Sequence, residues 1–345
     1  MKALEVAAPH SLGLVEQDVR VIGENDVLVR TAVAAICHTD HYLIEGTHPA
    51  ARYPVIPGHE FSGTVEAVGK KVRHLAPDAR VAVQTILPCL HCRHCRYGRI
   101  NLCTDGEELG RLRAGGFAEF VVVPAYALHP IEDDFPLEQA ALTEPSANAH
   151  ALVRSAEIET GDAVAVIGPG PIGLLTLQYA LLKNPSRAIL VGLPHDRERL
   201  ALGKQLGATD TLAVPPQEAA QILEGWTNGH GVDRVLQCAP SVEATALALA
   251  IAGLNATVAI EGVAARSASI SVKPDEILQK QITLRGVRGW MVSDFVTALE
   301  MNQSGRVDVA SLITHRFSLD QYQVAFELTG NYQDGVVKAA FEFGS

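Results

Sequence analysis

Four cysteines crowd into one short stretch of the chain, at Cys89, Cys92, Cys95 and Cys103. Their spacing is C-x2-C-x2-C-x7-C, and gaps of two residues allow successive sulfurs to surround a single tetrahedral ion. Because four thiolates fill every coordination position of zinc, we expect a closed, structural zinc site here. Such an ion would fix a loop that has little hydrophobic core of its own. Redox-active or incidental thiols are the alternative interpretation.

A second group of metal-binding residue types precedes this loop. Cys37 follows the apolar residues Ala34-Ala35-Ile36, and His59 and Glu60 lie next to each other after Gly58. Thiolate, imidazole and carboxylate are the kinds of ligand that zinc takes, and a catalytic zinc keeps three protein ligands and one open position. The group is therefore a candidate catalytic zinc site. A core cysteine and a buried histidine beside a surface glutamate would explain the same residues.

Glu144 is a further candidate for the neighbourhood of this metal. It lies in Thr143-Glu144-Pro145, directly after the apolar residues Ala140-Ala141-Leu142. A carboxylate is costly to bury without a partner, so its place in an apolar segment suggests a cation nearby. The alternative is a carboxylate near the N-terminus of a helix that begins around Ser146, where the helix dipole favours negative charge.

A glycine-rich turn in the middle of the chain has the pattern of a dinucleotide-binding motif. The apolar residues 164–167 lead into Gly168-Pro169-Gly170-Pro171-Ile172-Gly173, and the apolar residues 174–182 follow. This order predicts strand, tight turn and helix. Gly168 would permit the turn, Gly170 would let the backbone approach a pyrophosphate, and Gly173 would let the helix pack closely on the strand. The helix N-terminus would then face the phosphates, whereas the alternative is a plain glycine-rich loop.

The position that usually distinguishes NAD from NADP is unusual in this chain. A carboxylate that binds the ribose hydroxyls of NAD is expected about 20 residues beyond the glycines, but Leu193 occupies that position. Asp196 could reach back to the ribose. Alternatively, Arg197 or Arg199 could pair with a 2′-phosphate, which would favour NADP slightly. Both arginines could also be ordinary surface residues of the following helix.

The segments that must position these residues fall into two kinds. Residues 1–36 are β-rich, with a strand predicted at 27–33. Further strands are predicted at 63–69 and, as a pair, within 115–124. After Gly173, strands alternate with helices, which predicts a parallel sheet with crossover helices. The strands are expected at 188–191, 232–238, 257–262 and 282–286, and the helices at 197–206 and 241–252.

Five motifs together resemble one enzyme family. Cys37-x-Thr39-Asp40, Gly58-His59-Glu60, the four-cysteine loop, Thr143-Glu144-Pro145 and Gly168–Gly173 occur in the order seen in zinc-dependent medium-chain alcohol dehydrogenases. The segments 311–317 and 335–338 resemble the closing strands of that family. Glu144-Pro145 resembles the sorbitol/polyol and threonine dehydrogenase branch, because the ethanol-oxidising branch has a cysteine ligand near this position.

The resemblance implies an α/β fold in two domains. A Rossmann parallel sheet would form the cofactor domain at 149–287. A β-rich, GroES-like catalytic domain with a structural zinc lobe would take 1–148 and 288–345. One catalytic and one structural zinc ion per chain are implied, together with NAD or NADP. The implied cofactor contacts are Gly168, Gly170, Pro171, Ile172, Gly173, Leu193 and Arg197.

The resemblance also implies roles for the residues around the catalytic zinc. Cys37 and His59 would be ligands, and Glu60 or Glu144 would complete the set directly or through water. Thr39 would carry the substrate's proton outward, and Asp40 would orient His59. Family members often have a histidine five residues after the ligand cysteine, where this chain has Tyr42. The terminal proton acceptor therefore stays open between His41, His48 and bulk water.

The implied reaction is hydride transfer between a secondary alcohol of a polyol or sugar-like substrate and NAD(P). Simple alcohols or aldehydes and threonine-like amino alcohols are the alternatives within the family, and threonine would need a cation for its carboxylate. A non-catalytic relic of the fold is a more distant alternative. Such a relic should have lost its metal ligands, yet Cys37, His59, Glu60 and Glu144 are all present.

Composition limits the partners. The chain of 345 residues is 48% hydrophobic and 19% charged, which is ordinary for a globular enzyme, and its formal net charge is −11. This charge argues against nucleic acid or an anionic membrane as a partner. The N-terminal residues lack the apolar core of a signal peptide, and no apolar run is long enough to span a membrane. We therefore expect a cytoplasmic protein, and the family resemblance implies a homodimer or homotetramer that acts on a small alcohol or ketone.

Overall fold

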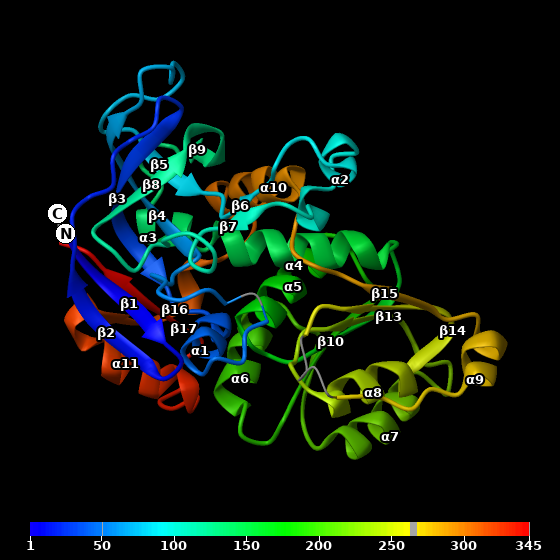
Figure 1. Ribbon diagram of the computed structural model, residues 1–345. Helices are drawn as coiled ribbons and strands as arrows, with labels where there is room; N and C mark the ends of the chain where they lie inside the picture. The colour runs from blue at the N-terminus through cyan, green and yellow to red at the C-terminus, as the bar shows by residue number, and fades with distance from the viewer. Residues whose placement is uncertain (50, 263–267, 345) are drawn as a thin grey trace. The chain divides into compact units, whose positions relative to one another are not determined.

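The computed structural model describes residues 1–49, 51–262 and 268–344. Two compact units are present, one formed by Met1–Ala147 with Met291–Ser345 and the other by Asn148–Trp290 (Figure 1). The first dividing point lies within α4 (Thr143–Ala156). In the described part of the chain, no helix combines the length and apolar character needed to cross a membrane.

The second unit is built on a six-stranded, entirely parallel sheet. Its spatial order is β12-β11-β10-β13-β14-β15, which is the 3-2-1-4-5-6 order of a Rossmann fold. The strands are β10 (Ala163–Ile167), β11 (Arg187–Gly192), β12 (Asp210–Ala213), β13 (Val232–Gln237), β14 (Ala252–Ile260) and β15 (Thr283–Gly286). The helices are α5 (Pro171–Leu181), α6 (Arg197–Gln205), α7 (Pro216–Trp226), α8 (Val242–Ala250) and α9 (Pro274–Lys280). The predicted parallel sheet with crossover helices is confirmed.

Apolar runs explain why this sheet is covered on both faces. Leu223 of α7 and Leu247 of α8 pack in one core with Ile167 and Val191, and these two helices lie side by side (Figure 1). On the other face, Leu190 contacts α6 at Gly203, where an added Cβ would lie only 2.2 Å from the leucine. Burial on two faces favours the near-continuous apolar sequences of the central strands β10 and β11.

The first unit is built on a seven-stranded, mostly antiparallel sheet. Its order is β16-β17-β3-β4-β5-β9, and β8 also pairs with β3. The strands are β3 (Asp26–Ala35), β4 (Glu60–Val68), β5 (Arg80–Val83), β8 (Phe120–Pro124), β9 (Leu128–Pro130), β16 (Ile313–Phe317) and β17 (Lys338–Glu342). Two further pairs are β1 (Lys2–Ala8) with β2 (Ser11–Glu16) and β6 (Ile86–Leu87) with β7 (Glu107–Glu108). The helices are α1 (His38–Ile44), α2 (Arg93–Arg96), α3 (Leu137–Ala141), α10 (Val292–Gln303) and α11 (Tyr322–Gly330).

The strand register of this unit brings segments that are distant in sequence to the same end of three neighbouring strands. Ala35, the last residue of β3, pairs with Glu60, the first residue of β4, and also with Ala340 of β17. The Ile36 N–H donates to the Ala339 carbonyl at 2.8 Å. The residues just after β3 and the first residues of β4 and β17 therefore lie together at the same end of these three neighbouring strands.

The structure corrects two of the predicted strand segments. The stretch 115–124 contains one named strand, β8, and not a pair. Its first residues form a loop because the N–H groups of Gly115 and Gly116 donate to the carbonyls of Ile56 and Gly58, outside any ladder. The last strand begins at Lys338 and not at Gly335.

Candidate active site

The thiol, imidazole and carboxylate predicted as a catalytic metal site lie together. Cys37 Sγ, a ring nitrogen of His59 and a carboxylate oxygen of Glu60 are all within 4.8 Å of one another. Cys37 is the residue before α1, and His59 and Glu60 stand at the start of β4. The Ala35–Glu60 pairing described above explains why residues so far apart in sequence meet here. Sulfur, nitrogen and oxygen donors at this separation fit one zinc ion.

Asp40 ties two of these three residues together. Its carboxylate is fully buried, lies 3.5 Å from His59 Nδ1, and accepts N–H bonds from Cys37 at 2.9 Å and Gly58 at 3.4 Å. Because Nδ1 faces Asp40, Nε2 is the ring nitrogen left for a metal. Asp40 thus lies where the predicted orienting residue should be.

The electrostatics of Asp40 and His59 reflect their mutual contact. Burial opposes the charged form of Asp40, but His59 and the two N–H donors outweigh it and lower the pKa of the carboxyl group. Burial likewise opposes protonation of His59, whereas the charges of Cys37 and Asp40 raise the pKa of its ring well above the usual value. The negative charges of Cys37 and Asp40 therefore favour a positive charge bound at the ring, and a metal ion on Nε2 would supply one.

Lys338 is a member of the site that the sequence analysis missed. Its Nζ lies 2.7 Å from Glu60 Oε2, donates to Oε1 at 2.9 Å, and donates to the Ile36 carbonyl at 3.1 Å. Lys338 is 4% exposed and Glu60 is 1% exposed, so the ion pair is shielded from water. Burial opposes the charge of Lys338, but Glu60 and Cys37 raise its pKa overall. A lysine between Val336-Val337 and Ala339-Ala340 is the signal that could have pointed to a buried partner.

Thr39 and Glu144 also lie in this neighbourhood. The Thr39 hydroxyl is 3.7 Å from Cys37 Sγ. Glu144 is 6% exposed and belongs to the first turn of α4. Among the described residues, the potential ligand groups whose atoms lie within 4.8 Å of one another include Glu60 and not Glu144. Glu60, and not Glu144, is therefore the carboxylate that forms the close group with Cys37 and His59.

His41 is held by a neighbouring helix. Its Nε2 is hydrogen-bonded to the Thr329 hydroxyl of α11 at 3.0 Å, and burial lowers the pKa of the ring. Tyr42 is the residue five positions after Cys37, and its ring meets that of His38 edge-on with centroids 4.9 Å apart.

The four-cysteine loop forms a second cluster. The sulfur–sulfur distances are 3.9 Å for Cys89–Cys95, 3.5 Å for Cys92–Cys95 and 3.9 Å for Cys92–Cys103. Four sulfurs about 2.3 Å from a central zinc would lie about 3.8 Å apart, so the loop has the size of a tetrahedral site. The N–H groups of Cys95 and Thr104 lower the pKa of Cys92, which favours its thiolate, whereas burial and the neighbouring sulfurs raise the pKa of Cys95.

The glycine-rich turn has the geometry predicted for it. Gly168 has φ +101°, a region that favours glycine, and a Cβ on Gly173 would lie 1.8 Å from the Gly168 carbonyl oxygen. A Cβ on Gly170 would meet no atom of the described residues within 4 Å, so these residues leave space in front of the turn. Helix α5 begins at Pro171, directly followed by Ile172. The turn therefore presents a free helix N-terminus to an approaching group.

The position just after β11, where a carboxylate for the ribose of NAD is expected, is occupied by Leu193. Leu193 is exposed, and its N–H donates to Asp196 Oδ2 at 2.9 Å. Asp196 also lies 3.8 Å from Arg199, so this acid faces its own loop and helix. Arg197 is exposed at the start of α6.

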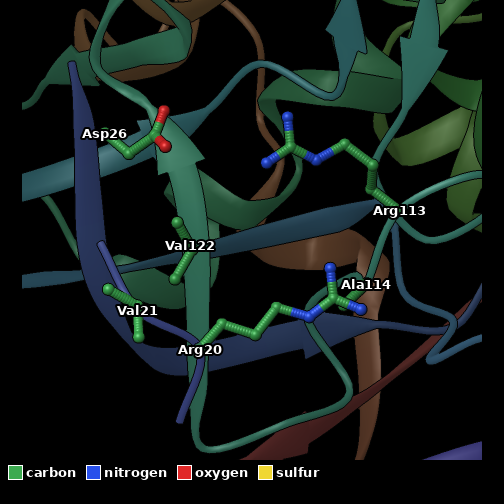
Figure 2. A pocket seen from close by; sticks show the side chains of 6 residues that line it. All are labelled: Arg20, Val21, Asp26, Arg113, Ala114 and Val122. Carbon is green, nitrogen blue, oxygen red and sulfur yellow. The ribbon is translucent and has the colours of Figure 1, made fainter. Parts of the chain in front are cut away.

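A separate surface pocket of about 180 Å³ lies elsewhere in the first unit. Figure 2 shows the side chains that line it: Arg20, Val21, Asp26, Arg113, Ala114 and Val122. It contains none of the residues predicted for the metal sites or the cofactor.

Comparison with known proteins identifies the family. Residues 23–133 match the alcohol dehydrogenase GroES-like domain, and residues 171–304 match the zinc-binding dehydrogenase domain. The chain belongs to the zinc-dependent medium-chain alcohol dehydrogenases and is an oxidoreductase that uses zinc and NAD(P). This agrees with the resemblance noted from its motifs.

Three relatives illustrate the similarity. A sorbitol dehydrogenase of Halalkalibacterium halodurans is 31% identical over 94% of this chain and 95% of its own length. An L-threonine 3-dehydrogenase of Bacillus subtilis is also 31% identical, over 94% and 93%. The crystal structure of a putative zinc-binding dehydrogenase from Sinorhizobium meliloti 1021 bound to NADP superposes with a TM-score of 0.92 at 30% identity, and 99% of each chain is covered.

Proposed function

We propose that this protein oxidises a secondary hydroxyl group of a polyol or sugar-like substrate, with NAD(P) as the hydride acceptor. The observation that carries the proposal is the Cys37–His59–Glu60 group, whose three donor atoms lie within 4.8 Å. Similarity to a sorbitol dehydrogenase over nearly the whole chain supports the substrate class. Similarity to an L-threonine 3-dehydrogenase keeps a hydroxy amino acid as the second candidate.

In this proposal Cys37, His59 and Glu60 hold the catalytic zinc, and the four cysteines of the loop hold the structural zinc. Glu60 is preferred to Glu144 because it shares the close group with the other two ligands. Bound zinc would favour ionisation of a substrate hydroxyl and polarise the corresponding carbonyl. Asp40 fixes the orientation of His59, since it faces Nδ1 and leaves Nε2 for the metal.

The protein's own groups then manage position and proton. Thr39, 3.7 Å from Cys37 Sγ, has a hydroxyl that would accept the substrate's proton while donating its own onward. Gly168, Gly170 and Gly173 with Pro171 and Ile172 would hold the pyrophosphate of the cofactor at the start of α5. The nicotinamide supplies the redox chemistry.

We propose NADP rather than NAD as the preferred cofactor. Asp196 faces the Leu193 N–H and Arg199, whereas Arg197 is an exposed cation at the start of α6, shortly after β11. A guanidinium suits a 2′-phosphate, whereas NAD requires a carboxylate toward the ribose. An Arg197→Gln variant should lose the preference and leave the rate with NAD unchanged.

The test is an initial-rate measurement of nicotinamide reduction at alkaline pH, with NAD and NADP each crossed against sorbitol, a simple primary alcohol and L-threonine. Turnover of the polyol by protein that carries two zinc ions per chain supports the proposal. Activity only on the primary alcohol contradicts the substrate class and keeps the zinc chemistry. No turnover of any alcohol by fully zinc-loaded protein contradicts the proposed function as a whole.

The setting of the enzyme is part of the same proposal. A cytoplasmic homodimer or homotetramer is proposed, because β15 is an edge strand of the parallel sheet and its Thr283 and Leu284 are exposed for pairing with a second copy. Sedimentation equilibrium would distinguish these assemblies from a monomer.

A further inference from the structure

A cationic side chain that the proposed function does not use lies beside the catalytic group. Arg111 belongs to the loop between β7 and β8, and one carbonyl shapes this loop. The Glu108 carbonyl accepts the N–H groups of Arg111 at 3.3 Å, Leu112 at 2.9 Å and Arg113 at 3.1 Å. The Gly110 N–H closes the turn by donating to the Arg113 carbonyl at 2.8 Å. The backbone of Arg111 is therefore fixed.

The loop is packed directly against the segment that precedes His59. A Cβ on Gly110, with φ +81°, would lie 2.8 Å from the backbone of Gly58, so these two glycines are in close contact. The Gly116 N–H donates to the Gly58 carbonyl at 2.7 Å. Arg111 is thus the neighbour of a residue that contacts Gly58, and Gly58 is the neighbour of His59. These contacts hold the loop that carries Arg111 against the segment that leads into His59.

The guanidinium of Arg111 is incompletely paired. One of its terminal nitrogens lies 2.9 Å from Glu108 Oε1, and 23% of its side chain is exposed. Its Nε is buried and has no hydrogen-bond acceptor among the described residues. Burying a donor of a charged group without an acceptor is unfavourable, so an acceptor from outside the chain is the natural complement.

The charges that act on Arg111 belong to the candidate active site. Burial opposes its charge, and Glu108, Glu144, Cys37 and Asp40, in that order, raise its pKa. Cys37 is a proposed zinc ligand, Asp40 contacts the ligand His59, and Glu144 is the second carboxylate considered for the site. The guanidinium therefore lies within electrostatic reach of the place where the substrate hydroxyl must bind, and not only on the outer surface.

We infer that Arg111 binds an anionic group of the substrate, a phosphate or a carboxylate, and so makes the enzyme select anionic alcohols over neutral ones. The inference rests on the proposed function, because the anion must be carried by an alcohol that reaches the same site. A guanidinium offers a planar fork of donors that matches carboxylate and phosphate oxygens, and it keeps its charge across the working pH range. Arg111 then acts as a specificity residue, while the reacting hydroxyl is handled by Thr39 and the metal.

The test compares alcohols that differ only in the anion. The pairs are sorbitol 6-phosphate with sorbitol, galactitol 1-phosphate with galactitol, and L-threonine with L-threoninamide. For the wild type we expect kcat/KM to be at least about tenfold higher for an anionic member, as a charged hydrogen bond would provide. The phosphate and carboxylate pairs show which of the two anions is bound.

Variants assign that preference to one residue. Arg111→Gln should raise the KM for the anionic alcohol of a pair about tenfold to a hundredfold. The kcat, the KM for the neutral alcohol and the KM for the cofactor should change little. Arg111→Lys should restore part of the preference, because it keeps the charge without the fork. Arg113→Gln is the matched control, since Arg113 lies in the same loop, pairs with Glu107 at 3.5 Å and lines the separate surface pocket. It should behave as the wild type.

The outcomes separate this inference from the proposed function. A wild type that prefers neutral alcohols overturns the inference and keeps the proposed function. An Arg111→Gln variant with two zinc ions and a native circular dichroism spectrum would also overturn the inference if its kcat/KM fell equally for the anionic and the neutral alcohol of a pair. That pattern would indicate a structural role for Arg111. A rise in the cofactor KM alone overturns it as well. Absence of turnover with every substrate overturns the proposed function, and the inference with it.

Discussion

The two metal-binding groups of the first unit are built in opposite ways. The four cysteines come from one continuous loop and are all partly exposed, and backbone N–H groups donate to the sulfurs of Cys89 and Cys103. The Cys37–His59–Glu60 group combines three kinds of donor from separate elements, and His59 and Glu60 are almost completely buried. One is a site that four like ligands close. The other is a site whose ligands are held by further charges.

This difference shows where each site obtains its rigidity. In the loop, the metal itself would hold the chain, since the segment has little core. In the buried group, Asp40 and Lys338 position His59 and Glu60 through an ion contact of 3.5 Å and an ion pair of 2.7 Å. We therefore expect the loss of a metal ligand to change chemistry in the buried group and stability in the loop.

Replacing Cys37 with serine should have the largest effect. The substitution removes the thiolate of the proposed catalytic zinc, and a bound metal contributes several kcal/mol of charge stabilisation, so kcat/KM should fall at least about a thousandfold. Zinc content measured by mass spectrometry should fall from two ions to one per chain, with little change in thermal stability. Retention of both ions with normal rates would show that Cys37 is not a ligand.

Replacing Lys338 with methionine tests the buried charges. Removal of one partner from a buried ion pair leaves the Glu60 charge unpaired, which typically destabilises a protein by about 3 to 5 kcal/mol. The loss should be measured on metal-free protein by urea unfolding, and zinc should restore much of it because the ion then neutralises Glu60.

The matched control is Lys2→Met. Lys2 forms an ion pair with Asp320 at 2.8 Å, but both side chains are exposed, so its loss should change the free energy of unfolding by less than about 1 kcal/mol. If both variants were equally stable, or if zinc gave the Lys338 variant no advantage, the buried pair would not support the metal group.

The same contrast explains what the sequence could and could not predict. Cys89–Cys103 and Gly168–Gly173 were predictable because each motif carries its geometry within a few residues. Lys338 was missed because its partner lies 278 residues away and is reached through the pairing of β3 with both β4 and β17. Spacing along a chain contains no information about such register.

Residues 115–124 show that a local sequence preference can also predict a strand that the fold does not form. Their composition favours two strands, but the N–H groups of Gly115 and Gly116 bind the carbonyls beside His59. A tertiary contact overrides the local preference at this point. The loop that carries Arg111 is held by that contact, so neither the loop nor its cation could be placed from the sequence.

Replacing Cys92 with serine should affect stability more than rate. The variant should lose the loop zinc and about 2 to 3 kcal/mol of stability, because the metal contributes folding energy to a segment with little core. Differential scanning calorimetry gives the loss, and limited proteolysis should cut the loop between Cys89 and Cys103. A normal kcat per folded molecule is expected. A fall in kcat as large as that of the Cys37 variant would mean that the two sites are not distinct in function.

Replacing His91 with alanine should have the smallest effect. His91 is exposed, and its Nδ1 is 2.7 Å from the Cys89 carbonyl, so it lies near the loop sulfurs without being needed by them. Cys89, His91 and Asp105 form an alternative set of donors, but both His91 and Asp105 are exposed, and four thiolates already complete a tetrahedral zinc. Zinc content should stay at two ions per chain, and the free energy of unfolding should change no more than for a typical surface substitution, within about 0.5 kcal/mol. Loss of one zinc ion on this substitution would make the histidine a ligand. The loop would then be a mixed-donor site like the buried group, and its exposure alone would distinguish the two.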